Sequence, residues 1–144
     1  MTKSSKAFRS LLKREEFVYM PVAYNPIGGR LVQSMGFKVV YTGGFVTGGS
    51  MCTTEPLLTM DEQIRVAEGV AHAVKIPLVA DGGAGYGEPL HTMRTVREFI
   101  RAGIAGIHIE DQFYPKRAHY HKYVAHAIPA KDFVDKIRMA CRER

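Results

Sequence analysis

Apolar and polar positions along the chain predict helices and strands in strict alternation. Four short, nearly continuous apolar runs are typical of buried strands, and apolar stripes with helical spacing lie between them. The predicted strands are residues 17–23, 37–42, 76–80 and 104–109. The first predicted helix follows Ser4 and Ser5, which can cap it. Four further helices are predicted, from Pro26 to Gly36, from Thr59 to Val74, from Pro89 to Gly103 and from about Ala130 to the end.

Local signals fix several of these boundaries. Asn25 before Pro26 is a typical N-cap and first helical position, and Thr59 with Glu62 forms a capping box. Residues 43–50 form a glycine-rich stretch, residues 81–87 a flexible glycine loop, and residues 110–129 a long polar loop. The final helix is expected to face inward through Phe133, Ile137 and Ala140.

Alternation of this kind implies parallel strands joined by helical crossovers, and hence an α/β fold. Two architectures fit the pattern, an open doubly wound sheet and part of a β/α barrel, and hydrophobic patterning alone leaves both open. A length of 144 residues suits one domain, residues 1–144.

Composition excludes several classes of protein. Apolar residues at 46% and charged residues at 24% are ordinary for a soluble globular chain. No apolar run approaches the roughly 20 residues that span a bilayer, and no signal peptide is visible, so we expect no membrane partner. Two cysteines cannot build a disulfide framework, which favours a cytoplasmic location. The net charge of +6 combines basic ends with an acidic centre, unlike a nucleic-acid groove.

The candidate chemistry follows the carboxyl ends of the predicted strands, where ligands bind in either architecture. Apolar strands there deliver carboxylates to one rim, with cationic groups close behind. In chain order the rim residues are Tyr24, Asn25, Thr42, Gly43, Gly44, Glu55, Asp81, Glu110, Lys116, Arg117, His119 and His121.

Asp81 and Glu110 form the sharpest pair. Each directly follows an apolar strand, and the two strands are expected to be neighbours. Two carboxylates held together repel unless a cation lies between them, and Mg²⁺ takes such ligands readily. The alternative is that each acid merely caps a helix or faces solvent, which explains one such residue better than two.

Glycine-rich segments supply the second set of candidates. The loop 81–87 matches neither the dinucleotide-binding nor the P-loop pattern, so we interpret it as backbone that approaches a ligand closely; a tight connection is the alternative. Thr42, Gly43 and Gly44 could bind an anion or form a plain turn. His119 and His121 lack an obvious third metal ligand, so they are candidates for proton transfer, substrate contact or simple solvation.

The stretch PLVADGGAGYGEPLHTMRTVREFIRAGIAGIHIEDQFYPKRAHYHK resembles the isocitrate lyase/phosphoenolpyruvate mutase superfamily. The family pattern is an Asp-x-Asp-x-Gly-[Tyr/Phe]-Gly loop, then A-G-x-A-G-x-x-I-E-D-Q, then P-K-R-C-G-H. Upstream, PVAYNPIGGRLVQSMGFKVVYTGG resembles the family's first βαβ unit. The resemblance covers about residues 8–144.

The resemblance implies a TIM-type (β/α) barrel and Mg²⁺- or Mn²⁺-dependent chemistry on small 2-oxo or 2-hydroxy carboxylic acids through an enolate-like intermediate. It assigns Asp81 to the metal, Glu110 to metal-bound water, and Thr42, Gly43 and Gly44 to a substrate carboxylate. Lys116 matches the lysine of the family's cationic loop, and Arg117 follows it. The implied reaction is C–C cleavage or decarboxylation; alternatives are a phosphonomutase-type P–C enzyme and a catalytically retired homologue.

Two departures from the family pattern bear on activity. Gly83 replaces the second Asp of the metal loop, so the site either binds more weakly or recruits Glu55, although Thr54 aligns there about as well. Ala118 replaces the lyase cysteine, so His119 or His121 would have to donate the proton.

Four β/α units are half of an eight-stranded barrel, which typically needs about 250 residues. We therefore expect this chain to form roughly the first four units of a barrel. The rest would come from a longer chain or from another copy, and a homo-oligomer is expected.

Overall fold

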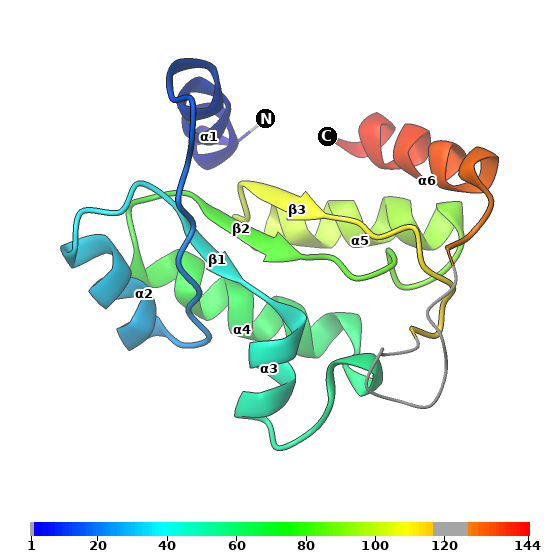
Figure 1. Ribbon diagram of the computed structural model, residues 1–144, viewed down its shortest axis with the longest axis horizontal. Coiled ribbons are helices and arrows are strands. Elements are labelled where there is room, and N and C mark those ends of the chain that lie inside the picture. The colour runs from blue at the N-terminus through cyan, green and yellow to red at the C-terminus, as the bar shows by residue number, and fades with distance from the viewer. Residues whose placement is uncertain (1, 117–126) are drawn as a thin grey trace.

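The computed structural model describes residues 2–116 and 127–144 and contains a parallel β-sheet at its centre (Figure 1). Its strands are β1 (Val40–Thr42), β2 (Leu78–Asp81) and β3 (Gly106–His108), in that spatial order. Both pairs are parallel, and the register places Asp81 opposite His108. The predicted α/β class with a parallel sheet is confirmed, although each strand is shorter than its apolar run.

The prediction of a strand over residues 17–23 is largely wrong, because most of this segment is irregular. Only its end pairs with the sheet, through a parallel bridge between Val22 and Tyr41. Ala23 N–H donates to the Tyr41 carbonyl at 2.8 Å, and Tyr41 N–H donates to the Pro21 carbonyl at 3.0 Å. Because Pro21 has no N–H to donate, the ladder cannot continue through that position. This segment nonetheless adds a short fourth parallel stretch beside β1.

Three helices cover one face of the sheet and bury the main core (Figure 1). They are α2 (Pro26–Ser34), α4 (Met60–Ala73) and α5 (Pro89–Arg101). The core between them and the strands contains Ala23, Val32, Val40, Ala67, Val70, Leu78, Ala80, Phe99, Ala102 and Ile104. The apolar stripe predicted for α4 is confirmed, since Ala67 and Val70 are buried. The stripe predicted for α2 is wrong except at Val32, because Ile27, Leu31 and Met35 are exposed.

A smaller core lies on the opposite face of the sheet. Leu11 of α1 (Lys3–Arg14) packs there against Val39 and Val79. The N-cap of this helix is Thr2, whose hydroxyl accepts the Ser5 N–H at 3.1 Å, and not Ser4 or Ser5 as predicted.

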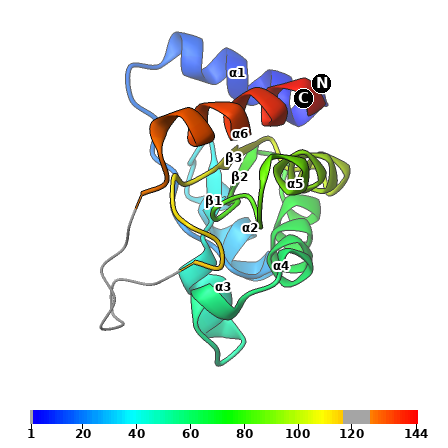
Figure 2. The same cartoon turned by 90° about the vertical axis from the view of Figure 1, so that its right-hand side faces the viewer.

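The last helix, α6 (Ala130–Glu143), packs on α5 (Figures 1 and 2). Arg97 and Glu143 join the two helices by two hydrogen bonds of 3.0 Å. The predicted inward position of Ala140 is confirmed, but Ile137 is 36% exposed and Lys136, which was not predicted, is buried instead.

The glycine-rich stretch 43–50 is not irregular. It forms α3 (Gly44–Ser50), followed by the 3₁₀ turn η1 (Glu55–Leu57). Glycine disfavours helices by about 1 kcal/mol per residue, so helix propensity did not predict this helix. Its glycines permit close packing: a Cβ on Gly48 would lie 3.0 Å from the Glu55 backbone nitrogen.

Other predicted boundaries are confirmed. The Asn25 side chain accepts the Gly28 N–H at 2.7 Å and caps α2. Thr59 and Glu62 form the capping box of α4. Gly103 ends α5 with a φ of +80°, a conformation that glycine adopts at little cost. In the part of the chain that the structure describes, no helix is long and apolar enough to cross a membrane.

Candidate functional site

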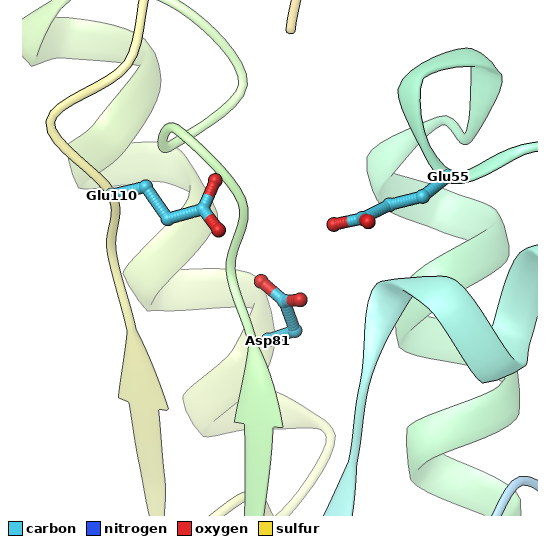
Figure 3. A group of neighbouring side chains, drawn as sticks. All are labelled: Glu55, Asp81 and Glu110. Carbon is cyan, nitrogen blue, oxygen red and sulfur yellow. The ribbon is translucent and has the colours of Figure 1, made fainter. Parts of the chain in front are cut away.

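Three carboxylates converge at the carboxyl edge of the sheet (Figure 3). Asp81 is the last residue of β2, Glu110 lies two residues beyond β3, and Glu55 begins η1. One oxygen from each lies within 4.8 Å of the others, and all three side chains are partly buried. The structure thus brings together the three residues that the sequence proposes as metal ligands, with Glu55 rather than Thr54 supplying a carboxylate.

Backbone groups orient the central carboxylate. Asp81 Oδ1 accepts the Gly83 N–H at 2.8 Å, and Oδ2 accepts the Gly44 N–H at 3.1 Å. Gly44 also lets Glu55 approach, since a Cβ there would lie 2.8 Å from Glu55 Cγ. Gly83 therefore supports the site through its amide, although it has lost the family's second carboxylate.

Lys116 is the counter-cation of this cluster. Its Nζ lies 2.5 Å from Glu55 Oε1 and 3.0 Å from Glu110 Oε1, and donates a hydrogen bond to each. Burial opposes the charged ammonium, but the hydrogen bonds to Glu110 and Glu55 outweigh burial and raise the pKa of Lys116. The lysine therefore stays protonated at neutral pH.

The carboxylate cluster is suited to a divalent cation. Glu110 Oε2 lies 2.8 Å from Lys116 Nζ, but the Lys116 hydrogen bond goes to Oε1. Both oxygens of Glu110 therefore contact the lysine cation, whose place a divalent ion could take. Glu110, Glu55 and Asp81 together offer carboxylate oxygens, which are the ligands that Mg²⁺ and Mn²⁺ take in proteins.

A small cavity of about 20 Å³ adjoins the cluster and is lined by Asp81, Glu55 and two tyrosines. It has room for about one water molecule. The rings of Tyr86 and Tyr114 meet edge to face with centroids 6.3 Å apart. Burial, aided by Asp81, raises the pKa of Tyr86, so its phenol stays neutral. Sequence reasoning missed both tyrosines, although both lie within the motifs that carry the resemblance.

A third tyrosine borders the site from β1. Burial, with the charges of Asp81, Glu110 and Glu55, raises the pKa of Tyr41. Its ring lies 5.3 Å from that of His108, which places this histidine on the same face of the sheet.

The predicted substrate-binding residues have mixed outcomes. Thr42 is fully buried, and its hydroxyl donates to the Ala23 carbonyl at 2.9 Å, so the predicted contact of this hydroxyl with substrate is not supported. Asn25 is similarly committed to capping α2, and Tyr24 is 49% exposed at the adjoining position. Gly43 and Gly44 lie at the start of α3, beside Asp81.

Three predicted catalytic residues cannot be placed. Arg117, His119 and His121 lie outside the residues that the structure describes, so their roles remain predictions.

Comparisons with known proteins agree with this geometry. The family model described as phosphoenolpyruvate phosphomutase matches residues 8–144. A probable 2-methylisocitrate lyase 2 from Corynebacterium glutamicum is 37% identical over 117 residues, which are 81% of this chain and 38% of the relative. A 2-methylisocitrate lyase from Aeropyrum pernix is 35% identical over 137 residues, covering 94% of this chain and 44% of the relative.

A solved structure gives the same answer for the fold. Phosphoenolpyruvate phosphomutase from Streptomyces platensis subsp. rosaceus superposes with a TM-score of 0.93 at 31% identity. The match covers 98% of this chain and 50% of that protein. The chain thus spans about half the length of the proteins it matches, and it belongs to the isocitrate lyase/phosphoenolpyruvate mutase superfamily.

Proposed function

We propose that the chain forms part of a Mg²⁺-dependent lyase that acts on a small 2-oxo or 2-hydroxy carboxylic acid, by C–C cleavage or decarboxylation. The observation that carries the proposal is the convergence of Glu55, Asp81 and Glu110 on one point beside Lys116. The two curated relatives described above are named as 2-methylisocitrate lyases, one of them as a probable one, which supports the same reaction class.

The three carboxylates would hold the cation, Asp81 directly and Glu110 and Glu55 directly or through water. Mg²⁺, when bound, supplies Lewis-acid stabilisation of an oxyanion that develops on the substrate. Mn²⁺ takes the same kind of ligands and can replace it.

Residues around the cluster would bind and orient the acid. The resemblance assigns Gly43 and Gly44 to a substrate carboxylate; because the Gly44 N–H donates to Asp81 Oδ2 at 3.1 Å, a substrate carboxylate would have to replace that contact. Lys116, once released from its acidic partners, would place a positive charge beside the developing negative charge. Arg117 would assist it, and His119 or His121 would move the proton.

A P–C bond reaction is the second candidate. The observation in its favour is the TM-score of 0.93 to a phosphoenolpyruvate phosphomutase. Both reactions place negative charge on an enolpyruvate-like oxygen, so one carboxylate cluster serves either. Lys116 is equally suited to a phosphonate and to a carboxylate.

The test is a thermal-unfolding titration with Mg²⁺ or Mn²⁺, with and without oxalate or pyruvate, followed by a panel of acids. We expect the metal to raise the melting temperature, and the anion to raise it further. Release of pyruvate or CO₂ from 2-oxo or 2-hydroxy acids would support a lyase, whereas turnover of phosphonopyruvate alone would support the second candidate. No metal-dependent shift under any condition would indicate a retired homologue.

The wider organisation is part of the proposal. We propose that residues 1–144 are a single partial domain, about the first four units of a (β/α) barrel, in a cytoplasmic homo-oligomer. An apolar groove of about 490 Å³ beside β3 supports the partial barrel, because its lining mixes residues of α1, β3 and α6 that a further strand could cover. A further strand of the barrel would pair with β3 at that edge.

A further inference from the structure

Lys136 of α6 is buried in an unusual way for a lysine. Lys136 is only 4% exposed, and its Nζ donates a hydrogen bond to the Ala84 carbonyl at 2.9 Å. Lysine is almost never this buried unless it is paired. Among residues 2–116 and 127–144 no carboxylate lies within ion-pair distance of the ammonium. Burial lowers the pKa of Lys136, and the charge of Glu88 only partly opposes this effect.

The group that Lys136 holds belongs to the glycine loop that follows Asp81. Four successive carbonyls of this loop each accept a hydrogen bond, and the donors come from the loop itself, from the segment after β3, from α6 and from α5. The pairs are Gly85 N–H to Gly82, Glu110 N–H to Gly83, Lys136 Nζ to Ala84 and Thr95 hydroxyl to Gly85, at 2.8–3.0 Å.

The loop needs such support because one of its residues, Tyr86, is a non-glycine residue in the left-handed region. Gly83, Gly85 and Gly87 have φ values of +50°, +79° and +139°, and Tyr86 has +54°. A non-glycine residue at positive φ is strained and persists only where its surroundings hold it. Contacts from neighbouring elements therefore fix this conformation.

The conformation of the loop in turn sets two of the three carboxylates. Gly83 N–H donates to Asp81 Oδ1, and the Gly83 carbonyl accepts the Glu110 N–H at 2.8 Å. Ala84, which Lys136 anchors, is the next residue. A shift of the Ala84 carbonyl would therefore move the peptide groups that orient Asp81 and Glu110.

We propose that Lys136 is a positioning residue that anchors the Ala84 carbonyl and so holds Asp81 and Glu110 in the geometry of the candidate metal site. Its effect on metal affinity rests on the function proposed above, whereas its effect on the loop does not. The anchor also links α6, which follows the basic loop after Lys116, to the segment that carries the site.

The test compares Lys136→Met, which keeps the apolar stem, with Lys136→Arg, which keeps a cationic donor. Arg97→Met is the matched control, because it removes the Arg97–Glu143 contact between α5 and α6 without touching the loop. Hydrogen exchange of segments 81–88 and 108–112 reports on the loop, with segment 60–73 as reference. Mn²⁺ titration of the purified chain reports on the site.

We expect Lys136→Met to exchange at least tenfold faster in both loop segments and to bind Mn²⁺ about tenfold more weakly, with Lys136→Arg closer to wild type. Arg97→Met should lower the melting temperature while leaving both readouts unchanged. If Lys136→Met does not fold, Lys136→Gln, which is too short to reach Ala84, replaces it.

The inference would be overturned if the loop of Lys136→Met exchanged at the wild-type rate, or if Arg97→Met changed loop exchange as much as Lys136→Met does. A wild-type chain that binds no Mn²⁺ would instead refute the proposed function, and hydrogen exchange would still decide the role of Lys136.

Discussion

Lys116 occupies the place of a cation among the three carboxylates, so its removal should tighten metal binding. In the structure its Nζ lies 2.5 Å from Glu55 Oε1 and 2.8 Å from Glu110 Oε2. A divalent ion must compete with this ammonium for the same oxygens. Lys116→Met keeps most of the apolar stem of the side chain but removes the competing charge.

The magnitude follows from the burial of the pair. The side chains of Lys116 and Glu55 are only 14% and 17% exposed, and that of Glu110 is 32% exposed. Breaking a fully buried pair costs about 3–5 kcal/mol, and an exposed pair is worth about 0–1 kcal/mol. We therefore expect the metal-free variant to lose about 1–3 kcal/mol of unfolding free energy.

Bound metal should restore most of this loss, because it neutralises the same carboxylates. By linkage, the variant should bind Mn²⁺ about ten- to a hundredfold more tightly than wild type. Turnover should nevertheless fall, because the positive charge beside the substrate is gone. Affinity and activity would thus change in opposite directions.

The assay is calorimetric titration of Mn²⁺ together with thermal unfolding in the absence and presence of the metal. Lys38→Met is the matched control, since Lys38 pairs with Glu15 at 2.7 Å on the surface, where its side chain is 60% exposed. That variant should leave Mn²⁺ affinity unchanged. Equal or weaker affinity in Lys116→Met, with the control at the wild-type value, would refute the competition between lysine and metal.

Three glycine substitutions give further predictions. Gly83→Asp should bind Mn²⁺ more tightly than Gly83→Asn, because only the aspartate adds a negative charge to the site. Either side chain has room, since a Cβ at Gly83 meets nothing within 4 Å, but the φ of +50° costs each variant about 1 kcal/mol of stability; equal Mn²⁺ affinities would contradict the prediction. Gly44→Ala should push the Glu55 side chain out of the cluster and weaken Mn²⁺ binding about tenfold, with little change in melting temperature. Gly85→Ala should lower the unfolding free energy, measured by urea denaturation, by about 2–4 kcal/mol, since its Cβ would clash with Thr92 Oγ1 at a φ of +79°; a change below about 1 kcal/mol would contradict the packing argument.

Much of the fold follows from short-range signals in the sequence. The caps at Asn25 and Thr59 depend on one side chain and the next turn, so they are legible without a structure. Asp81 and Glu110 could be paired because parallel strands deliver the residues that follow them to one edge. The structure places both carboxylates in one cluster.

Other features depend on contacts that no local pattern encodes. The helix α3 is rich in glycine, a poor helix former, and its glycines are needed for close contact with Glu55. Lys136 lies next to the predicted apolar stripe of α6, and only its contact with Ala84 explains its burial. The hydroxyl of Thr42 could serve a substrate or the sheet, and spacing alone cannot distinguish these roles.

The central claim is that Glu55, Asp81 and Glu110 form a divalent-cation site. Its most direct test is a titration of Mn²⁺, monitored by electron paramagnetic resonance, with wild type, with Asp81→Asn and with the exposed control Asp61→Asn. We predict one saturable Mn²⁺ per chain, unchanged in Asp61→Asn and weakened at least a hundredfold in Asp81→Asn. Absence of saturable binding in wild type, or equal affinity in Asp81→Asn, would contradict the claim.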